Sequence, residues 1–273
     1  MRIGSVSGAA RAVAARMARA ALPCLALLGF ASPASAETLV GPDIELRESA
    51  LQGGGARTGR LLEWLALIEL DIAVLTEFRR GNSGDQMARG LASQGLRHLA
   101  SPESPRGVNS VLIASRFPLQ ERMIETSPSD SHRLVSVEVE GVELAGVYFA
   151  QKNEKKPLYQ ALDSASDELL NGQSLIMGDF NTGIRGVDEK GESFYAEECF
   201  ISLLNQGWID SWRSRHPTRT EFSWYSRKGA GFRIDHALAS LALDERISSA
   251  RYEHSVREAG LSDHSALVVE IAD

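Results

Sequence analysis

The sequence predicts an α/β sandwich, an α+β fold in which sheets and helices form layers, and two observations indicate it. Apolar runs of strand length are interleaved with longer segments whose apolar residues recur at helical spacing. Because helices that cover buried strands build layered folds, this order disfavours an all-β protein. Neither an internal repeat nor a linker rich in Pro, Gly or Ser follows residue 40, so we expect one domain at residues 37–273.

A helix followed directly by a buried strand is expected first. Residues 57–70, RTGRLLEWLALIEL, place apolar residues at helical spacing, whereas residues 71–78, DIAVLTEF, form an apolar run that ends at Glu77. Residues 110–119, SVLIASRFPL, predict a second strand, which Pro118 stops.

The middle of the chain predicts a hairpin, a helix and another buried strand. Residues 133–150 alternate apolar and polar positions on both sides of Gly141, which is typical of two antiparallel strands. Residues 157–172 begin with Pro and end with Gly, and both match helix boundary signals. Residues 174–180, SLIMGDF, predict a buried strand.

The C-terminal third predicts one more helix and the last two strands. Residues 196–207 are amphipathic and have a glycine where helices commonly stop. Residues 231–240, GFRIDHALAS, and residues 264–273, HSALVVEIAD, have the pattern of strands. The polar stretch at residues 244–260 is expected to separate them.

Residues 1–36 have the pattern of a secretory signal peptide. They contain four arginines and no acid, followed by an apolar run of about eleven residues and an A-x-A site that ends at Ala36. This run is shorter than the roughly 20 residues that span a bilayer, so we expect no stable membrane anchor. The predicted location is therefore secreted or periplasmic. The alternative is a cytosolic extension from a misassigned start, which would make the protein cytoplasmic.

The charge of the remaining chain limits how it can bind nucleic acid. Residues 37–273 contain 25 basic residues against 36 acidic ones, a formal charge of −11. Binding to a phosphate backbone must therefore depend on a local basic patch and on metal ions. Cys199 is the one cysteine in this part of the sequence, so it cannot form an intrachain disulfide there.

Acids and amides recur where the apolar strands end. They are Glu77, Asp179, Asn181, Asp235 and Asp263, and His264 follows the last of them. Strand ends in a layered fold converge on one face, so these oxygens can meet around a hard cation such as Mg²⁺. A histidine beside them suits proton transfer or hydrogen bonding to an oxyanion. Each residue alone also fits an ordinary turn or strand exit, as Asp179 and Asn181 do beside their glycines.

The motifs DIAVLTEF, LIMGDFN, FRIDHALAS and LSDHSALV, in this order, resemble those of the endonuclease/exonuclease/phosphatase superfamily. Within it, the chain is most similar to the exodeoxyribonuclease III type of abasic-site endonuclease, over about residues 51–272. The resemblance implies a four-layered sandwich, in which two mixed sheets pack face to face and helices flank them. It also implies a divalent-metal-dependent phosphodiesterase, with DNA or another phosphodiester as its partner and Mg²⁺, or alternatively Mn²⁺, as its cofactor.

The resemblance implies a role for each motif residue. Glu77 and Asp263 would bind the metal ion. Asp179 would orient or deprotonate the attacking water, and Asn181 would hold Asp179 and the phosphate in place. His264, oriented by Asp235, would contact a non-bridging phosphoryl oxygen. The catalytic set is Tyr148, Asp179, Asn181, Asp235 and His264.

A basic and aromatic stretch at residues 208–233 suits a phosphate backbone with stacked bases or sugars. We assign substrate binding to Arg133, Trp224 and Arg233. The alternative is that the tryptophans are core residues and the arginines a solvated rim, and we expect at least Trp212 or Trp224 in the core. The protein is expected to act as a monomer.

One departure from the family pattern leaves two other functions open. Ala50 stands where the family usually has an asparagine that serves the metal or the phosphate. The chain would then be a catalytically weakened or silent member. The same metal loop also serves phosphatases and phosphodiesterases that act on phospholipid head groups or inositol phosphates, which is the second alternative.

Overall fold

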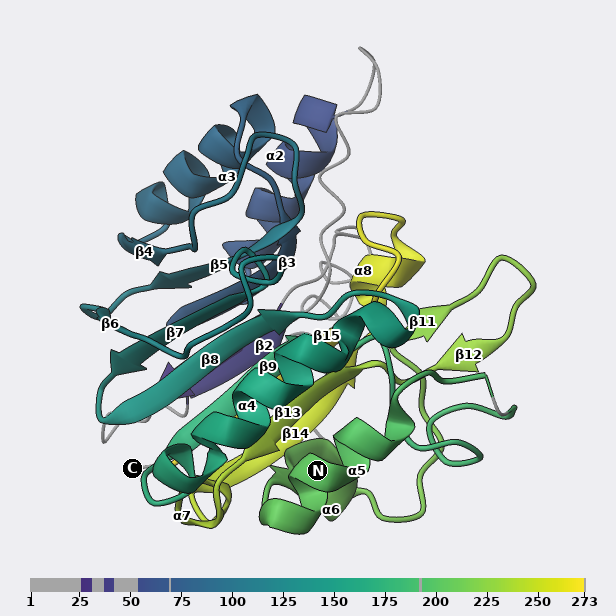
Figure 1. Ribbon diagram of the computed structural model, residues 1–273. Coiled ribbons are helices and arrows are strands. Elements are labelled where there is room, and N and C mark those ends of the chain that lie inside the picture. The colour runs from purple at the N-terminus through teal and green to yellow at the C-terminus, as the bar shows by residue number, and fades with distance from the viewer. Residues whose placement is uncertain (1–25, 31–36, 42–53, 69, 192, 273) are drawn as a thin grey trace, which may run out of the picture.

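The computed structural model describes residues 26–30, 37–41, 54–68, 70–191 and 193–272 (Figure 1). Two sheets pack face to face, and helices cover the outer face of each, so the protein has four layers. Both sheets contain parallel and antiparallel pairs. The predicted sandwich of two mixed sheets flanked by helices is therefore confirmed.

The first sheet is built from both ends of the described chain. Its strands are β1 (Ala26–Phe30), β2 (Glu37–Gly41), β3 (Ile72–Phe78), β4 (His98–Ala100), β5 (Ser110–Ser115), β14 (Ile247–Glu253) and β15 (Ala266–Ile271). Their order across the sheet is β14-β15-β1-β3-β5-β4, and β2 pairs with β3. Strand β3, which carries Glu77, is thus an interior strand.

The second sheet is formed by the middle of the chain. Its strands are β6 (Gln120–Arg122), β7 (Leu134–Val139), β8 (Val142–Tyr148), β9 (Ser174–Asp179), β10 (Ile209–Asp210) and β13 (Asp235–Ala239). They lie in the order β10-β13-β9-β8-β7-β6. The hairpin predicted around Gly141 is β7 and β8. A separate two-stranded ribbon consists of β11 (Trp224–Tyr225) and β12 (Gly231–Phe232).

Helices form the two outer layers (Figure 1). The helices of the described chain are α2 (Gly54–Leu65), α3 (Asn82–Ser93), α4 (Lys156–Leu169), α5 (Glu197–Gln206), α6 (Ser211–Arg215), α7 (Leu241–Asp244) and α8 (Ser255–Glu258). The one-turn 3₁₀ helix η1 (Lys152–Lys155) leads into α4. α2 and α3 pack on the first sheet, whereas α4 and α5 pack on the second. Two of the predicted helix boundaries are confirmed, since α4 has Pro157 in its first turn and α5 stops at Gly207.

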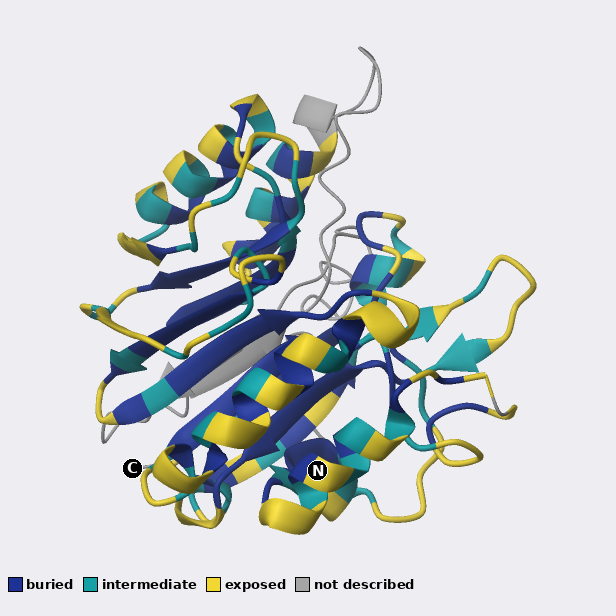
Figure 2. Cartoon of the chain, viewed as in Figure 1, coloured by how far each residue is buried: buried dark blue, intermediate teal, exposed yellow. Residues whose placement is uncertain are grey.

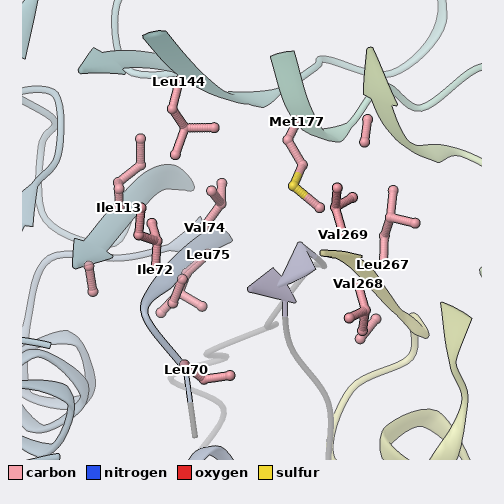
Figure 3. Packing of buried hydrophobic residues seen from close by; sticks show 14 of the residues in the cluster. Leu70, Ile72, Val74, Leu75, Ile113, Leu144, Met177, Leu267, Val268 and Val269 are labelled. Carbon is pink, nitrogen blue, oxygen red and sulfur yellow. The ribbon is translucent and has the colours of Figure 1, made fainter. Parts of the chain in front are cut away.

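The core between the sheets is apolar. Val74, Ile113, Leu144, Met177 and Val269 point into this space from strands of both sheets (Figure 3). Strands such as β3, β5, β8, β9 and β13 are buried along most of their length, while the helices keep an exposed side (Figure 2). Burying one such aliphatic side chain contributes about 1.5–3 kcal/mol, so this layer supplies much of the rigidity on which the strand ends depend.

Several elements are absent from the prediction, and the longest of them are β14 and α3. The segment at residues 244–260, predicted to be a polar connection between the last two strands, contains strand β14. Its pairing with β15 has a register shift between Ile247 and Ser249, which interrupts the alternation that would reveal a strand. Helix α3 is also absent from the prediction. Its sequence, NSGDQMARGLAS, contains two glycines, which weaken the helical signal.

The predicted signal peptide overlaps β1. Ala26–Phe30 lies between β15 and β3, parallel to the former and antiparallel to the latter. The sequence predicts no strand here, because this apolar run matches a signal peptide equally well. Cleavage after Ala36 would remove β1, and the signal peptide stays a prediction. Among the described residues, no helix is both long and apolar enough to cross a membrane.

Candidate active site

A cleft of about 670 Å³ opens at one end of the two sheets. Seven of the predicted site residues line it, namely Glu77, Tyr148, Asp179, Asn181, Trp224, Asp263 and His264. Glu77 comes from β3 of the first sheet, and His264 lies just before β15 of the same sheet. Asp179 ends β9 in the second sheet. The cleft therefore lies where the ends of both sheets meet. Ala50 lies outside the described residues.

Strand register places three of the predicted catalytic residues in one row. Tyr148 of β8 pairs with Asp179 of β9, and Asp179 pairs with Asp235 of β13. Directly paired residues on neighbouring strands present their side chains to the same face of a sheet, only a few ångströms apart. The sheet itself thus brings a phenol and two carboxylates together, although Tyr148 and Asp235 are 87 positions apart in the sequence.

The loop after β9 binds Asp179 at both carboxylate oxygens. The backbone N–H of Asn181 donates to Asp179 Oδ1 at 2.6 Å, and Asn181 Nδ2 donates to Oδ2 at 2.6 Å. Asn181 Nδ2 also donates to the Phe149 carbonyl at 2.9 Å. A two-residue step can do this because Asn181 has a left-handed backbone, with φ +49°. Asparagine tolerates that conformation better than most residues.

A glycine is required just before this loop. Gly178 has φ +146°, and a Cβ atom there would lie 2.0 Å from the Val147 carbonyl oxygen on the neighbouring strand. No side chain fits at that distance. Gly178 therefore lets β8 and β9 approach closely, which keeps Tyr148 and Asp179 in register.

His264 is oriented by a buried carboxylate. Its Nδ1 lies 2.9 Å from Asp235 Oδ2, while Asp235 has no exposed surface and His264 is 5% exposed. Tyr252 donates to the Asp235 carbonyl at 2.5 Å, and the His264 N–H donates to Ser262 Oγ at 3.0 Å. A carboxylate at Nδ1 favours the tautomer that carries its proton there, which fixes the role of Nε2.

Glu77 is bound from across the two sheets. Tyr148 donates its hydroxyl to Glu77 Oε1 at 2.7 Å and accepts a hydrogen bond from Asn109 Nδ2 at 3.3 Å. The Arg79 guanidinium in turn donates to Asn109 Oδ1. Glu77 is a second non-glycine residue with a left-handed backbone, at φ +53°. The sequence predicts no role for Asn109, because an asparagine before an apolar strand fits an ordinary loop.

Trp224 and Asp263 also line the cleft. Trp224 Nε1 donates to Asp263 Oδ2 at 3.2 Å, and the indole ring lies 6.2 Å from the His264 ring. Trp224 is half-buried, whereas Trp212 has no exposed surface. The sequence predicts that at least one of these two tryptophans lies in the core. Trp212 is that core residue, whereas Trp224 faces the cleft.

Arg133 lies beside this group. Its guanidinium carbon is 5.3 Å from the centre of the Tyr148 ring, and its Nε is 3.4 Å from Asp130. Cation–π contact of this kind holds an arginine next to the tyrosine face. The structure therefore brings Arg133 close to the catalytic row, and its role in substrate binding stays a prediction.

The predicted substrate-binding role of Arg233 is wrong. Its side chain has no exposed surface, and it donates to Asp188 Oδ1 at 2.7 Å and to Asp210 Oδ2 at 2.7 Å. Burial alone would raise the pKa of Asp210, but the Arg233 guanidinium holds that pKa well below its usual range. Arg233 is thus the centre of a buried ion network. Sequence alone does not show which arginine of a basic stretch turns inward.

The acidic groups of the cleft suit a magnesium ion, although they are few. Among the described residues, no group of three or more His, Cys, Asp or Glu side chains forms a ready metal cluster. Mg²⁺ usually takes one or two protein carboxylates and completes its shell with waters and substrate phosphates. The Glu77 and Asp263 carboxylates in one cleft fit that requirement.

The cleft also contains Arg57 of α2, Gln151 and Ser262, for which the sequence predicts no role. Tyr225 and Arg227, from the basic and aromatic stretch, line it as well. Arg57 has the pattern of any solvated helix residue, so only the fold shows that it faces the same space as Glu77. The two arginines give this acidic site a local positive charge, as phosphate binding requires.

Comparison with known proteins is consistent with this geometry. A family model described as the Endonuclease/Exonuclease/phosphatase family matches residues 49–264. The fold is similar to that of an AP endonuclease from Archaeoglobus fulgidus, with 21% identity, a TM-score of 0.72, and coverage of 86% of this chain and 99% of that one. It is also similar to a 3′ phosphatase from Neisseria bound to a product DNA hairpin, with 23% identity, a TM-score of 0.72, and 86% and 99% coverage. A 3′-5′ exonuclease from Neisseria meningitidis has 22% identity, a TM-score of 0.71, and 88% and 100% coverage.

Proposed function

The chain belongs to the endonuclease/exonuclease/phosphatase family, and on that premise we propose that it is a divalent-metal-dependent phosphodiesterase that acts as a nuclease on DNA. The observation that carries this proposal is the row of Tyr148, Asp179 and Asp235 across neighbouring strands, with Glu77 and His264 facing it from the other sheet. Phosphodiester hydrolysis needs a positioned water and groups that stabilise charge on the phosphoryl oxygens. The residues of the cleft can supply both.

Asp179 is the group that orients or deprotonates the attacking water. Both of its oxygens accept hydrogen bonds from Asn181, so its carboxylate is held in one orientation. A general base must be positioned within hydrogen-bond reach of the water, and this bidentate hold provides that positioning. Asn181 also faces the cleft, where it would contact the phosphate.

His264 serves the phosphoryl oxygen. With Nδ1 donating to Asp235, its Nε2 would donate a hydrogen bond to a non-bridging oxygen when the ring is an imidazolium, in which both ring nitrogens are donors. A donor aimed at a developing oxyanion typically accelerates such reactions by about 10²–10³-fold. Because Asp235 is fully buried, the orientation of His264 is set within the protein and not by the substrate.

Glu77 and Asp263 are the carboxylates that would hold the cation. When bound, a divalent ion supplies a Lewis acid that neutralises charge on the phosphate and lowers the pKa of a bound water. Tyr148 orients Glu77, and Trp224 donates to Asp263, so each carboxylate has a neighbour that fixes it. Mg²⁺ is the proposed ion, and Mn²⁺ is the alternative.

Nucleic acid is the substrate class that the cleft favours. Trp224 and Tyr225 offer aromatic surfaces, and Arg57 and Arg227 offer cationic ones, in the same cleft as the catalytic row. Aromatic and basic side chains together suit stacked bases and a phosphate backbone. A protein of the same fold, the Neisseria 3′ phosphatase, is bound to a DNA hairpin. Arg133 and Trp224 are the proposed substrate-binding residues, and the enzyme is proposed to act as a monomer.

The compartment decides which nucleic acid the enzyme meets. If residues 1–36 are removed as a signal peptide, residues 37–273 form a secreted or periplasmic nuclease that degrades extracellular nucleic acid. If they are a misassigned extension, repair of abasic sites in the cytoplasm becomes the proposed role.

A substrate panel tests the proposal. Purified protein is incubated with plasmid DNA, an abasic oligonucleotide, sphingomyelin and inositol phosphates, each with Mg²⁺ and with EDTA. We expect cleavage of DNA that requires Mg²⁺ and is abolished by EDTA. Hydrolysis of only the lipid or inositol substrates would replace the nuclease with the alternative phosphodiesterase, and activity on none would indicate a catalytically silent family member.

A further inference from the structure

A fully buried lysine lies behind the cleft. Lys155 ends η1 and has no exposed surface, so it cannot reach a substrate. Taking an ammonium group out of water is costly unless the group is hydrogen-bonded or paired. Arg233, the other large buried cation of the described residues, meets that cost with two carboxylates. Lys155 offsets that cost with backbone carbonyl oxygens instead.

Lys155 binds the backbone of the catalytic loop. Its Nζ lies 3.4 Å from the Phe180 carbonyl oxygen and also donates to the Asn181 carbonyl oxygen. These two carbonyls belong to the residues that directly follow Asp179. An unpaired buried carbonyl is itself unfavourable, so the ammonium and the loop satisfy one another.

This loop needs an internal support because its backbone is strained. It begins at Gly178, with φ +146°, and includes Asn181 in the left-handed region at φ +49°. A non-glycine residue in that region costs about 1–3 kcal/mol and persists only when its surroundings hold it. The hold comes from the Asn181 side chain, which binds Asp179 and Phe149, and from Lys155 on the carbonyl side.

The charge of Lys155 also faces Asp179. Burial lowers the pKa of Lys155 to about 8, and the negative charge of Asp179 opposes that decrease. The ammonium form therefore predominates at neutral pH. The Lys155 ammonium thus places a positive charge at the backbone carbonyls that directly follow Asp179, the acid that is proposed to handle the water.

From this geometry we propose that Lys155 is a positioning residue, which holds the Asp179–Asn181 loop in its reactive conformation without contacting the substrate. This inference rests on the proposed function, because it assigns a role within the same site. It predicts a larger effect on the rate of the chemical step than on substrate binding, to which this loop contributes the proposed Asn181 contact with the phosphate.

Steady-state kinetics of Lys155→Met on a DNA oligonucleotide test the inference. Methionine fills a similar volume but can neither donate a hydrogen bond nor carry charge. We expect kcat to fall by about 10²-fold, the size of effect that a misplacement of about 1 Å produces, with KM within about threefold of the wild-type value. Lys155→Arg, which keeps the charge and the donors, should recover part of the lost kcat.

Lys156→Met is the matched control, because Lys156 is the next residue and is partly exposed in an ion pair with Glu198. It should leave both kcat and KM unchanged. A kcat of Lys155→Met within threefold of wild type, or a raised KM with unchanged kcat, would overturn the inference. If Lys155→Met does not fold, as judged by circular dichroism, Lys155→Gln replaces it and is held to the same criteria.

A second measurement separates this inference from the proposed function. Hydrogen–deuterium exchange of the loop peptide should be faster in Lys155→Met than in the wild type, and it needs no turnover. Unchanged exchange would contradict the positioning role even if the protein hydrolyses DNA. Conversely, a wild-type protein inactive on every substrate would contradict the proposed function, while exchange would still report on Lys155.

Discussion

At the scale of single residues, the site depends on two strained backbone positions. Glu77 and Asn181 both have left-handed backbones, although neither is glycine. Such residues persist where several contacts determine them, and they concentrate at functional sites. Tyr148 holds the side chain of Glu77, and Asp179 and Phe149 hold that of Asn181. These supports make the following substitutions informative.

Asp179→Asn should remove most of the activity and leave the fold intact. The substitution keeps the size of the side chain but removes the charge that orients or deprotonates the water. We expect kcat on DNA to fall by at least about 10²-fold, with an unchanged circular dichroism spectrum. Asp167→Asn, on the exposed side of α4, is the control. Near-normal turnover by Asp179→Asn would refute its assignment.

Tyr148→Phe should raise the Mg²⁺ concentration that half-maximal activity requires. Because phenylalanine lacks the Tyr148 hydroxyl, Glu77 loses the 2.7 Å hydrogen bond that orients its carboxylate. Loss of such an outer partner typically costs about 10–100-fold in metal affinity or activity. The Mg²⁺ concentration for half-maximal activity measures this, and Tyr195→Phe, at an exposed tyrosine, should leave it unchanged. An unaltered Mg²⁺ requirement in Tyr148→Phe would contradict this role of the hydroxyl.

Part of the site can be predicted from the sequence because of the positions of its residues along the strands. Glu77 and Asp179 each follow an apolar run at the end of a strand, and Asp235 begins the apolar strand β13, so a carboxylate at the edge of an apolar run marks each of them. Asn109 and Lys155 have no such mark, since their partners are a phenol and backbone carbonyls from distant segments. Arg233 was assigned wrongly because its two acidic partners, Asp188 and Asp210, are distant in sequence and bury it.

At the scale of elements, the spacing of apolar residues predicts the helices and strands whose apolar pattern is regular, and it misses those whose pattern is interrupted or short. The helix α4 and the strands β3, β8 and β9 follow clear patterns of apolar residues, and each lies where it was expected. Strand β14 has a register shift, and α3 buries only Gly84, Met87 and Leu91. A short buried face leaves too few apolar positions to distinguish a helix from a loop.

The buried ion network joins elements beneath the cleft. Arg233 precedes β13, Asp210 lies at the end of β10, and Asp188 lies in the loop after the catalytic segment. His236 of β13 adds a 3.3 Å contact to Asp210. Removing one partner of a buried pair leaves an uncompensated charge and typically costs about 3–5 kcal/mol.

Asp210→Asn should therefore lower the free energy of unfolding by about 3–5 kcal/mol at pH 7. The pKa of Asp210 is depressed in the folded protein, so its contribution is full above the ordinary aspartate pKa. It decreases progressively as the pH falls from about 4 towards the depressed pKa of the folded state, because the unfolded chain then binds the proton first. Urea unfolding at pH 7 and at pH 3.5 measures this, with Asp167→Asn as the control. A difference that does not shrink at pH 3.5 would contradict the assigned direction.

At the scale of the whole molecule, the active site joins the two sheets. The hydrogen bond from Tyr148 to Glu77 and that between His264 and Asp235 each connect one sheet to the other. The cleft is thus a property of sheet packing, and the apolar layer between the sheets determines its geometry (Figure 3). A sequence pattern can mark the strand ends, but their meeting depends on how the two sheets stack.

The mature N-terminus is a second property of the whole molecule. If the signal peptide is cleaved after Ala36, the intact mass of the exported protein should correspond to residues 37–273. Mass spectrometry of the protein from the medium or periplasm measures it. An active protein that retains residues 26–30 would show that β1 belongs to the functional fold, and it would end the signal-peptide interpretation.

The most direct test is where a cation binds. Crystals grown with Mn²⁺ and inorganic phosphate can be measured at a wavelength at which manganese scatters anomalously. An anomalous peak in the cleft, contacted by the Glu77 carboxylate and on the same side as Asp179 and His264, is the result that metal-assisted hydrolysis at this site predicts. A peak elsewhere on the molecule, or a cleft that stays without metal at saturating Mn²⁺, would contradict it.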